Sequence, residues 1–321
     1  MQYGIAFLVV FALVMAMMPI FSRIATKFDF TDKPTERKKH EFPIPLSGGV
    51  AMFFAMAVGF LFFVLFADGA DPALWAVLGG AALIVVVGLV DDFSKARFKE
   101  FPVSPRLLVQ IGAASIAFAA GVRFTGFMNP FTDVYVYLPI GVQYVLTVLW
   151  FVGLITAFNF MDGLDGLSGL LALVSGVTFF VVAIHMNQPE SAFIAVIFVA
   201  AVTGFLRYNL PPAKVYMGDS GAYLLGFMLA AISLHGAFKQ ATVISLSIPM
   251  LAMGVPIFDS ILVVVRRLIA HKPAHIADST NITHIHFRLL KNGMKPSHAV
   301  MLIFLFSACL NLASIILLLA F

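Results

Sequence analysis

Long apolar runs separated by short polar segments are the main pattern along this chain. A helix needs roughly 20 apolar residues to cross the hydrocarbon layer of a membrane, and ten runs approach that length. We therefore predict an all-α polytopic integral membrane protein with about ten transmembrane helices and a single membrane-embedded domain over residues 1–321. The predicted spans are 4–22, 48–66, 73–90, 107–122, 140–158, 167–185, 192–206, 222–237, 241–265 and 299–321.

Composition excludes a soluble globular protein. Hydrophobic residues make up 61% of the 321 residues and charged residues 11%, whereas soluble domains have roughly 45 to 50% and about 25%. The first run has no basic residue before it and has Arg23 and Lys27 after it. This order is the reverse of a cleavable signal peptide, so we expect the run to remain as a membrane helix.

The loops differ in basic charge. All lysines and arginines except Arg123 and Lys239 fall within four segments, 22–47, 91–106, 207–221 and 266–298. Because cytoplasmic loops are enriched in these residues, we expect the four segments in the cytoplasm and both termini outside. The net charge of +4 then reflects orientation in a lipid bilayer, and no nucleic acid partner is expected. The outer segment 123–139 predicts a small hairpin.

Acidic side chains stand at the cytoplasmic ends of predicted helices. Asp91 and Asp92 are adjacent at the end of the third run, and an acid at the bilayer centre costs on the order of 3 kcal/mol. A cation such as Mg²⁺ or a proton is therefore an expected partner, although hydrated acids at a helix end are the alternative. Asp219, between Gly218 and Gly221, precedes the eighth run, where it either binds a metal or phosphate group or caps backbone amides.

The turn between the fifth and sixth runs is also acidic and is punctuated by glycine. Its sequence, NFMDGLDGLSG, provides Asn159, Asp162 and Asp165 without a basic residue. Carboxylates and an amide can bind hydroxyls, amides or a metal, and the alternative is a tight interhelical turn. Tyr216, three residues before Asp219, either stacks on a base or lies at the level of the lipid headgroups.

Histidines mark the last cytoplasmic loop. His284 and His286 alternate with Ile285 and precede Arg288, so imidazoles and a guanidinium can converge on a phosphate. A zinc site lacks a third ligand nearby, and solvated loop histidines are the alternative. In the ninth run, Asp259 is either functional or paired with Arg266 or Arg267, and Pro249 and Pro256 predict a break or bend.

Taken in order, five motifs resemble the polyprenyl-phosphate N-acetylhexosamine-1-phosphate transferase family. They are DKPxxRKxH with PxPxxGG in the first loop, VDD after the third run, NxxDGxDGL after the fifth, MGDSG before the eighth and HxHxRL before the tenth. The resemblance covers essentially the whole chain and is nearest to the GlcNAc-1-phosphate transferases. It implies a multi-pass protein of the bacterial cytoplasmic membrane that transfers a sugar-1-phosphate from a UDP-N-acetylhexosamine to undecaprenyl phosphate and releases UMP.

The resemblance also implies roles for particular residues and a Mg²⁺ cofactor, for which Mn²⁺ can substitute. Asp219 would be the principal metal ligand with Asp92 in the metal shell, and the catalytic residues would be Asp91, Asp92, His284 and His286. Arg106 stands where a lysine is common in the family. A homodimer is a further expected arrangement. The implied substrate-binding residues are Asn159, Asp162, Asp165, Tyr216, Arg106, Arg288, Lys39 and His40.

Two alternative functions stay open. Within the same family, the chain would transfer phospho-MurNAc-pentapeptide in peptidoglycan synthesis. In a different class, it would be a cation or proton-coupled transporter, since acids near helix ends also line ion paths. Against the transporter, only Asp259 lies well within a predicted span, so no polar path reaches the outer side.

Overall fold

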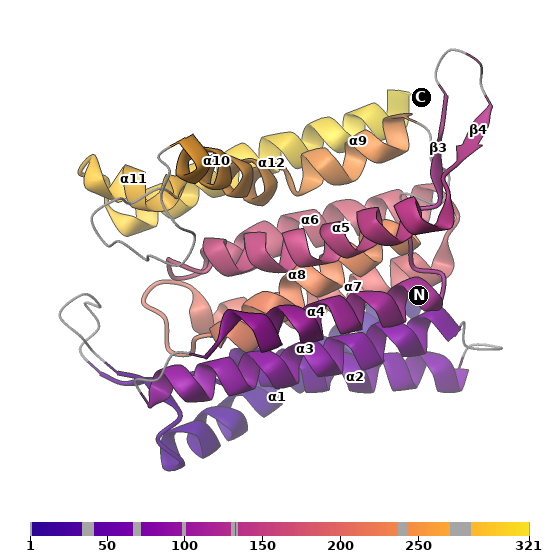
Figure 1. Cartoon of the computed structure of the whole chain (residues 1–321). Coiled ribbons are helices and arrows are strands. Elements are labelled where there is room, and N and C mark those ends of the chain that lie inside the picture. Colours follow the sequence, from indigo (N-terminus) through magenta and orange to yellow (C-terminus); the bar gives the residue numbers. More distant parts are fainter. Residues whose placement is uncertain are drawn as a thin grey trace.

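A computed structural model describes residues 2–33, 42–66, 72–97, 101–129, 132, 134–236, 243–269 and 284–320. These residues form a bundle of helices whose axes run in broadly the same direction (Figure 1). The helices are α1 (Gln2–Lys27), α2 (Gly48–Phe66), α3 (Pro72–Ala96), α4 (Val103–Ala119), α5 (Ile140–Met161), α6 (Leu167–His185), α7 (Pro189–Asn209), α8 (Gly218–His235), α9 (Val243–Ala252), α10 (Gly254–Ile269), α11 (Ile285–Lys291) and α12 (Pro296–Ala320).

Two short antiparallel strand pairs accompany the helices. The strand β1 (Thr31–Asp32) pairs with β2 (Ile44–Pro45), and β3 (Gly126–Met128) pairs with β4 (Tyr135–Tyr137). The second pair confirms the predicted hairpin in the segment 123–139.

The helices confirm an all-α polytopic membrane fold. Six described helices are long and apolar enough to cross a membrane: α1, α3, α5, α6, α7 and α12. Nine of the ten predicted spans coincide with one helix each. The predicted span 241–265 differs, because it is divided into α9 and α10.

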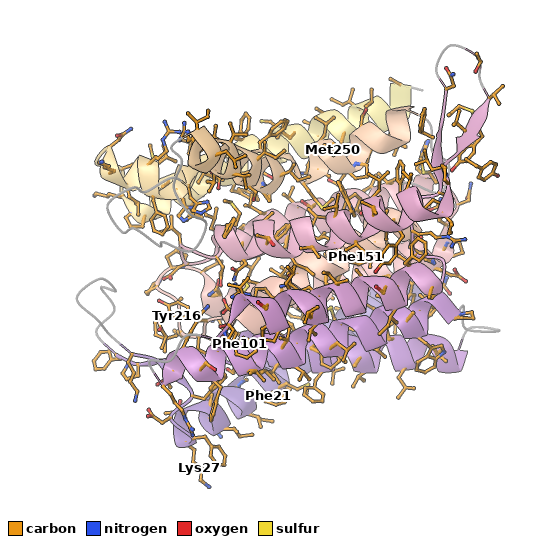
Figure 2. All side chains as sticks on the ribbon, viewed as in Figure 1. Phe21, Lys27, Phe101, Phe151, Tyr216 and Met250 are labelled. Atoms are coloured by element: carbon orange, nitrogen blue, oxygen red, sulfur yellow. The ribbon has the colours of Figure 1, made fainter. Side chains whose placement is uncertain are left out.

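The core lies around α8. This helix is apolar on every side, and almost all of its residues are buried against α2, α3, α5, α6 and α7, as expected for a helix enclosed by others. The opposite pattern holds on the outside of the bundle. Phe151 of α5 is fully buried, whereas Met250 of α9 is 42% exposed and points outward (Figure 2). Apolar side chains on the outer surface are what a lipid environment stabilises.

The two ends of the bundle differ in character. Both chain termini lie at the same end as the β3–β4 hairpin, while α11 and the segment with Tyr216 lie at the other end (Figures 1 and 2). Which side faces the cytoplasm stays a prediction from the distribution of basic residues.

The break between α9 and α10 has a specific cause. In a continuous helix the N–H of residue 256 would donate to the carbonyl oxygen of Ala252, but Pro256 has no N–H. Two side chains from other helices replace the missing donor. The Ser175 hydroxyl donates to the Ala252 oxygen at 2.7 Å, and Asn311 Nδ2 donates to the same oxygen at 3.0 Å. The break is therefore stabilised by α6 and α12, since a bare carbonyl inside a membrane is costly.

We expect the two donors to Ala252 to compensate for each other. Ser175→Ala or Asn311→Leu alone should lower stability by less than about 1 kcal/mol, whereas the double variant should lose roughly 1 to 3 kcal/mol because the carbonyl has no donor left. Thermal unfolding in detergent measures this, with Leu312→Ala on the exposed face of α12 as the control. Strictly additive small losses would contradict this account.

Candidate active site

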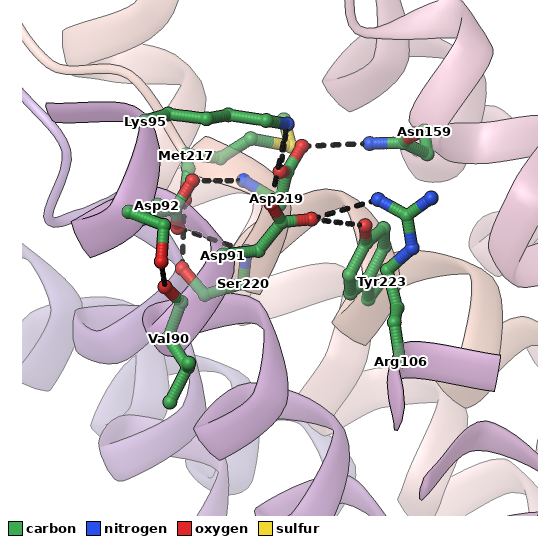
Figure 3. Close-up of polar contacts among 11 residues, drawn as sticks. Val90, Asp91, Asp92, Lys95, Arg106, Asn159, Met217, Asp219, Ser220 and Tyr223 are labelled. Carbon is green, nitrogen blue, oxygen red and sulfur yellow. Dashed lines mark hydrogen bonds and ion pairs between the residues drawn. The ribbon is translucent and has the colours of Figure 1, made fainter. Parts of the chain in front are cut away.

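Polar groups from α3, α5 and α8 meet in one cluster (Figure 3), at the end of the bundle opposite the termini (Figure 1). The end of α3 contributes Asp91, the start of α8 contributes Asp219, and the end of α5 contributes Asn159. Asn159 Nδ2 donates to Asp219 Oδ1 at 2.9 Å. Lys95, one turn after Asp91, forms an ion pair with Asp219 Oδ2, and its Nζ lies 3.8 Å from Asp91 Oδ1. The structure thus brings together groups that are more than one hundred residues apart.

Asp92 binds the start of α8. Its side chain is buried, its Oδ1 accepts the Asp219 N–H at 2.7 Å, and its Oδ2 accepts the Ser220 N–H at 3.1 Å. The first amides of a helix have no partner within that helix, so Asp92 caps α8 from the neighbouring helix. The alternative that Asp219 itself caps these amides is wrong, because its carboxylate is turned to Asn159 and Lys95.

Asp91 is held by only one of its two oxygens. Its Oδ2 accepts hydrogen bonds from Arg106 Nη1 and from Tyr223 Oη, each at 2.9 Å. Its Oδ1 is buried and has no hydrogen-bond partner among the residues that the structure describes. A buried oxygen without a partner is unusual in a folded protein, so this atom is a candidate ligand for a bound cation.

Sequence reasoning missed two of these residues. Lys95 stands four residues after Asp91 on one helix, a spacing that places the two side chains on one face, so its role was detectable. Tyr223 is 132 residues from Asp91, and no local pattern links them. With Arg106, the site contains three carboxylates and two cationic side chains, which leaves an excess of negative charge.

Glycines allow the site's helices to approach each other. A Cβ on Gly88 of α3 would overlap with the backbone of Ser220, and one on Gly49 of α2 would overlap with the backbone of Gly221. Gly218 has a φ of +69°, and a Cβ there would meet the Asp92 carboxylate. Small residues at helix contacts are typical of membrane bundles. Here they place the PxPxxGG, VDD and MGDSG motifs in direct contact.

The DGLDG turn lies beside this cluster. Asp162 Oδ1 accepts a hydrogen bond from the Ser168 hydroxyl at 2.8 Å. Burial, together with the negative charges of Asp219 and Asp165, raises the pKa of Asp162 to about 7, so protonated and ionised forms coexist at neutral pH. Asp165 Oδ2 accepts the Ala213 N–H at 3.0 Å, which ties the turn to the segment before α8.

The segment before α8 positions Tyr216. Asn209, a third residue missed from the sequence, is buried, accepts the Gly166 N–H at 3.0 Å and donates to the Val215 oxygen at 2.9 Å. The Tyr216 N–H donates to the Pro45 oxygen at 3.0 Å. Burial raises the pKa of Tyr216, so its phenol is neutral at physiological pH. Tyr216 is therefore held between the first loop and the DGLDG turn.

The two histidines differ in environment. His284 Nδ1 lies 2.7 Å from Asp259 Oδ2, and the His284 ring packs on Phe160 with centroids 4.8 Å apart. His286 is fully buried. Its ring packs so closely on Gly163 that a Cβ on Gly163 would overlap with the ring. Burial and the nearby His284 lower the pKa of His286 to about 4, which leaves this ring neutral at pH 7.

The remaining predicted residues differ in how far the structure describes them. Asp259 pairs with His284, so the alternative of a pair with Arg266 is wrong. Arg288 is exposed on α11, close in sequence to the histidines. Lys39 and His40 lie outside the described residues.

The carboxylate oxygens of Asp91 and Asp219 are suitable ligands for a hard divalent cation, but they do not form a complete ligand set by themselves. Within the described part of the chain, no three His, Cys, Asp or Glu side chains are arranged as a ready metal site. Mg²⁺ in proteins is usually held by one or two carboxylates together with water and substrate phosphates. Asp219 and Asp91, whose Oδ1 accepts no hydrogen bond among the described residues, both form ion pairs with Lys95 and fit this incomplete donor set.

Comparisons with known proteins agree with the motifs. The sequence model of glycosyl transferase family 4 matches residues 74–237. The "Probable undecaprenyl-phosphate N-acetylglucosaminyl 1-phosphate transferase" of Bacillus subtilis (strain 168) is 33% identical over 98% of this chain and 84% of its own length. The "Undecaprenyl-phosphate alpha-N-acetylglucosaminyl 1-phosphate transferase" of Yersinia pestis is 30% identical over 96% of this chain and 82% of its own length.

A third relative has a different named activity. The "Phospho-N-acetylmuramoyl-pentapeptide-transferase" of Listeria monocytogenes serotype 4b (strain CLIP80459) is 32% identical over 71% of this chain and 73% of its own length.

The fold, the motifs and these matches define a membrane-embedded transferase. This chain belongs to glycosyl transferase family 4.

The close contact between α3 and α8 can be tested with alanine. Gly88→Ala should force the two helices apart and lower stability by about 1 to 3 kcal/mol, as overpacking does. Gly79→Ala is the matched control, because it lies in the same helix and a Cβ there would meet open space. Thermal unfolding in detergent compares them, and equal stability of the two variants would show that Gly88 is not needed for this contact.

Proposed function

We propose that this protein transfers GlcNAc-1-phosphate from UDP-GlcNAc to undecaprenyl phosphate in a bacterial cytoplasmic membrane and releases UMP. The observation that carries the proposal is the meeting of Asp91, Asp92 and Asp219 with Lys95 and Arg106 at one end of the bundle. The names of the Bacillus and Yersinia relatives support N-acetylglucosaminyl 1-phosphate as the transferred group and undecaprenyl phosphate as the acceptor. The product would serve the synthesis of a cell-envelope glycan such as lipopolysaccharide or teichoic acid.

The proposed chemistry is a phosphoryl exchange. An oxygen of the lipid phosphate attacks the β-phosphorus of the UDP-sugar, the bond from that phosphorus to the oxygen bridging to the α-phosphate breaks, and UMP leaves. One pyrophosphate linkage is lost and one is formed, so the reaction needs no ATP. The main barrier is the repulsion between two anionic substrates, and positive charge placed in advance lowers it.

The chain's own side chains provide part of that charge. Lys95 and Arg106 would neutralise phosphate oxygens, while Tyr223 and Arg106 hold Asp91 in place. Asp92 would act through the backbone, because both of its oxygens bind the first amides of α8 and so fix the position of Asp219.

Mg²⁺, with Mn²⁺ as a substitute, is the cofactor that these residues fit. Asp219 and Asp91 would hold it, and the bound ion would act as a Lewis acid on phosphate oxygens. Lys95 occupies the space between the two carboxylates, and it would turn to the substrate phosphates when the ion binds.

The donor would lie along the acidic turn. Asn159, Asp162 and Asp165 would face the sugar and nucleotide, and Tyr216 would stack on the uracil base, as an aromatic side chain held at two backbone points can do. A neutral Asp162 can donate a hydrogen bond as well as accept one, which suits a wall that contacts hydroxyl or amide groups. His284 and Arg288, with Lys39 and His40, would serve the phosphates.

The donor assay distinguishes the two family activities. Purified protein with undecaprenyl phosphate and Mg²⁺ should release UMP from UDP-GlcNAc and not from UDP-MurNAc-pentapeptide. The Listeria relative makes the second donor a specific alternative, and UMP release from it alone would overturn the choice of sugar. Uptake of a cation by proteoliposomes without any UMP release would overturn the enzyme assignment.

The metal site can be tested at Asp219. Asp219→Asn should reduce UMP release by at least roughly 1000-fold, because a neutral amide is a much weaker Mg²⁺ ligand, while the thermal midpoint should change little. The control is Asp29→Asn, which alters an exposed acid whose partner within the described residues is Lys33. EDTA should abolish turnover and Mg²⁺ or Mn²⁺ should restore it. Full activity of Asp219→Asn would remove the metal assignment.

A further inference from the structure

The chemistry proposed so far gives Asp259 no role, although burying a carboxyl group in a membrane helix costs free energy. Asp259 lies in the first half of α10, which is largely apolar up to Arg266, and is only 5% exposed. An ionisable side chain in such a position needs a partner, and it marks a functional position more often than a structural one. Its contacts therefore indicate what it does.

Both oxygens of Asp259 bind the start of α11. Oδ2 lies 2.7 Å from His284 Nδ1, and Oδ1 accepts the Ile285 N–H at 2.8 Å. His284 is the residue that precedes α11, and its own side chain does not cap the helix. Asp259 thus holds the histidine by its ring and by the adjacent backbone, and these two points fix the orientation of the imidazole.

The contact also selects the tautomer of His284. An ionised carboxylate only accepts hydrogen bonds, so the neutral ring carries its proton on Nδ1 and its lone pair on Nε2. Among the residues that the structure describes, Nε2 has no hydrogen-bond partner. The side chain keeps 13% of its surface exposed. Nε2 is therefore the ring atom left for a ligand.

His286 does not offer the same opportunity. Its ring is fully buried against Gly163 and Phe287, and both of its nitrogens lack partners within the described structure. His284 instead packs on Phe160, the residue after Asn159, and Asn159 binds Asp219. The end of α5 therefore connects the Asp259–His284 pair to the carboxylate cluster.

We infer that Asp259 is a positioning residue that holds His284 with its proton on Nδ1 and presents Nε2 to the diphosphate of the nucleotide-sugar donor. This inference rests on the proposed function. It also separates the roles of the two histidines: His284 meets the substrate, and His286 packs the turn that faces it. Asp259 acts only through His284.

Two substitutions at Asp259 separate orientation from general packing. In Asp259→Asn the amide oxygen can still accept the Ile285 N–H, so only the partner of His284 Nδ1 changes. The amide nitrogen would then donate to Nδ1 and move the ring proton to Nε2. In Asp259→Glu a carboxylate remains. The matched control is Ser260→Ala, which removes a buried hydroxyl without a hydrogen-bond partner in the described structure from the same helix.

The first measurement is ¹⁵N NMR of histidine-labelled protein in detergent, with His284→Gln used to assign the signal. Wild-type protein and Ser260→Ala should show the Nδ1–H tautomer at His284, and Asp259→Asn should show the Nε2–H tautomer. A wild-type Nε2–H tautomer would overturn the inference without the need for any variant. This readout does not depend on activity.

The second measurement is UMP release from UDP-GlcNAc. Asp259→Asn should lower kcat roughly 10- to 100-fold, as misplacement of a group that contacts the reacting phosphates does, with KM changed less than about threefold. Asp259→Glu should recover most of the lost kcat, and Ser260→Ala should match wild type. A changed tautomer with unchanged kcat would overturn the role of His284 Nε2. If wild-type protein released no UMP from either donor, the proposed function would fail, and NMR alone would decide the Asp259–His284 contact.

Discussion

The Asp92 carboxylate at the start of α8 is the contact on which the site depends. It satisfies two amides that would otherwise be left bare inside a membrane protein, where water cannot replace the missing acceptor. The contact fixes the end of α3 against the first turn of α8. Asp91 immediately precedes Asp92 in α3, and Asp219 is the second residue of α8, so the contact brings these two carboxylates together. Position, not reactivity, is what Asp92 contributes.

The close approach of these helices depends on residues without side chains. Gly49, Gly88 and Gly218 lie where a Cβ would overlap with the neighbouring backbone or carboxylate. In lipid there is little hydrophobic gain from bringing helices together, so close packing and hydrogen bonds must stabilise the contact. This explains why Gly218 stands beside Asp219 in the MGDSG motif and why Gly88 lies two residues before the VDD motif.

A second polar system organises the other half of the bundle. Pro256 divides the predicted ninth span, and Ser175 and Asn311 stabilise the freed carbonyl of Ala252. The division gives α10 a start of its own, and Asp259 on α10 then holds His284 at the start of α11. The end of α5 lies between the two systems, with Asn159 bound to Asp219 and Phe160 packed on His284.

The helices could be predicted from the amino-acid sequence alone, because the length of an apolar segment decides whether it can cross a membrane, whatever its neighbours are. The sequence also identified Asp91, Asp92, Asn159 and Asp219 as candidate site residues, since polar side chains beside membrane spans are costly unless they have a partner. The partners of these side chains are known only from the folded structure. Tyr223 meets Asp91 from 132 residues away, and Asp259 binds His284 instead of the nearby Arg266. The partner of a buried polar group depends on which helices pack together, and no local pattern encodes that.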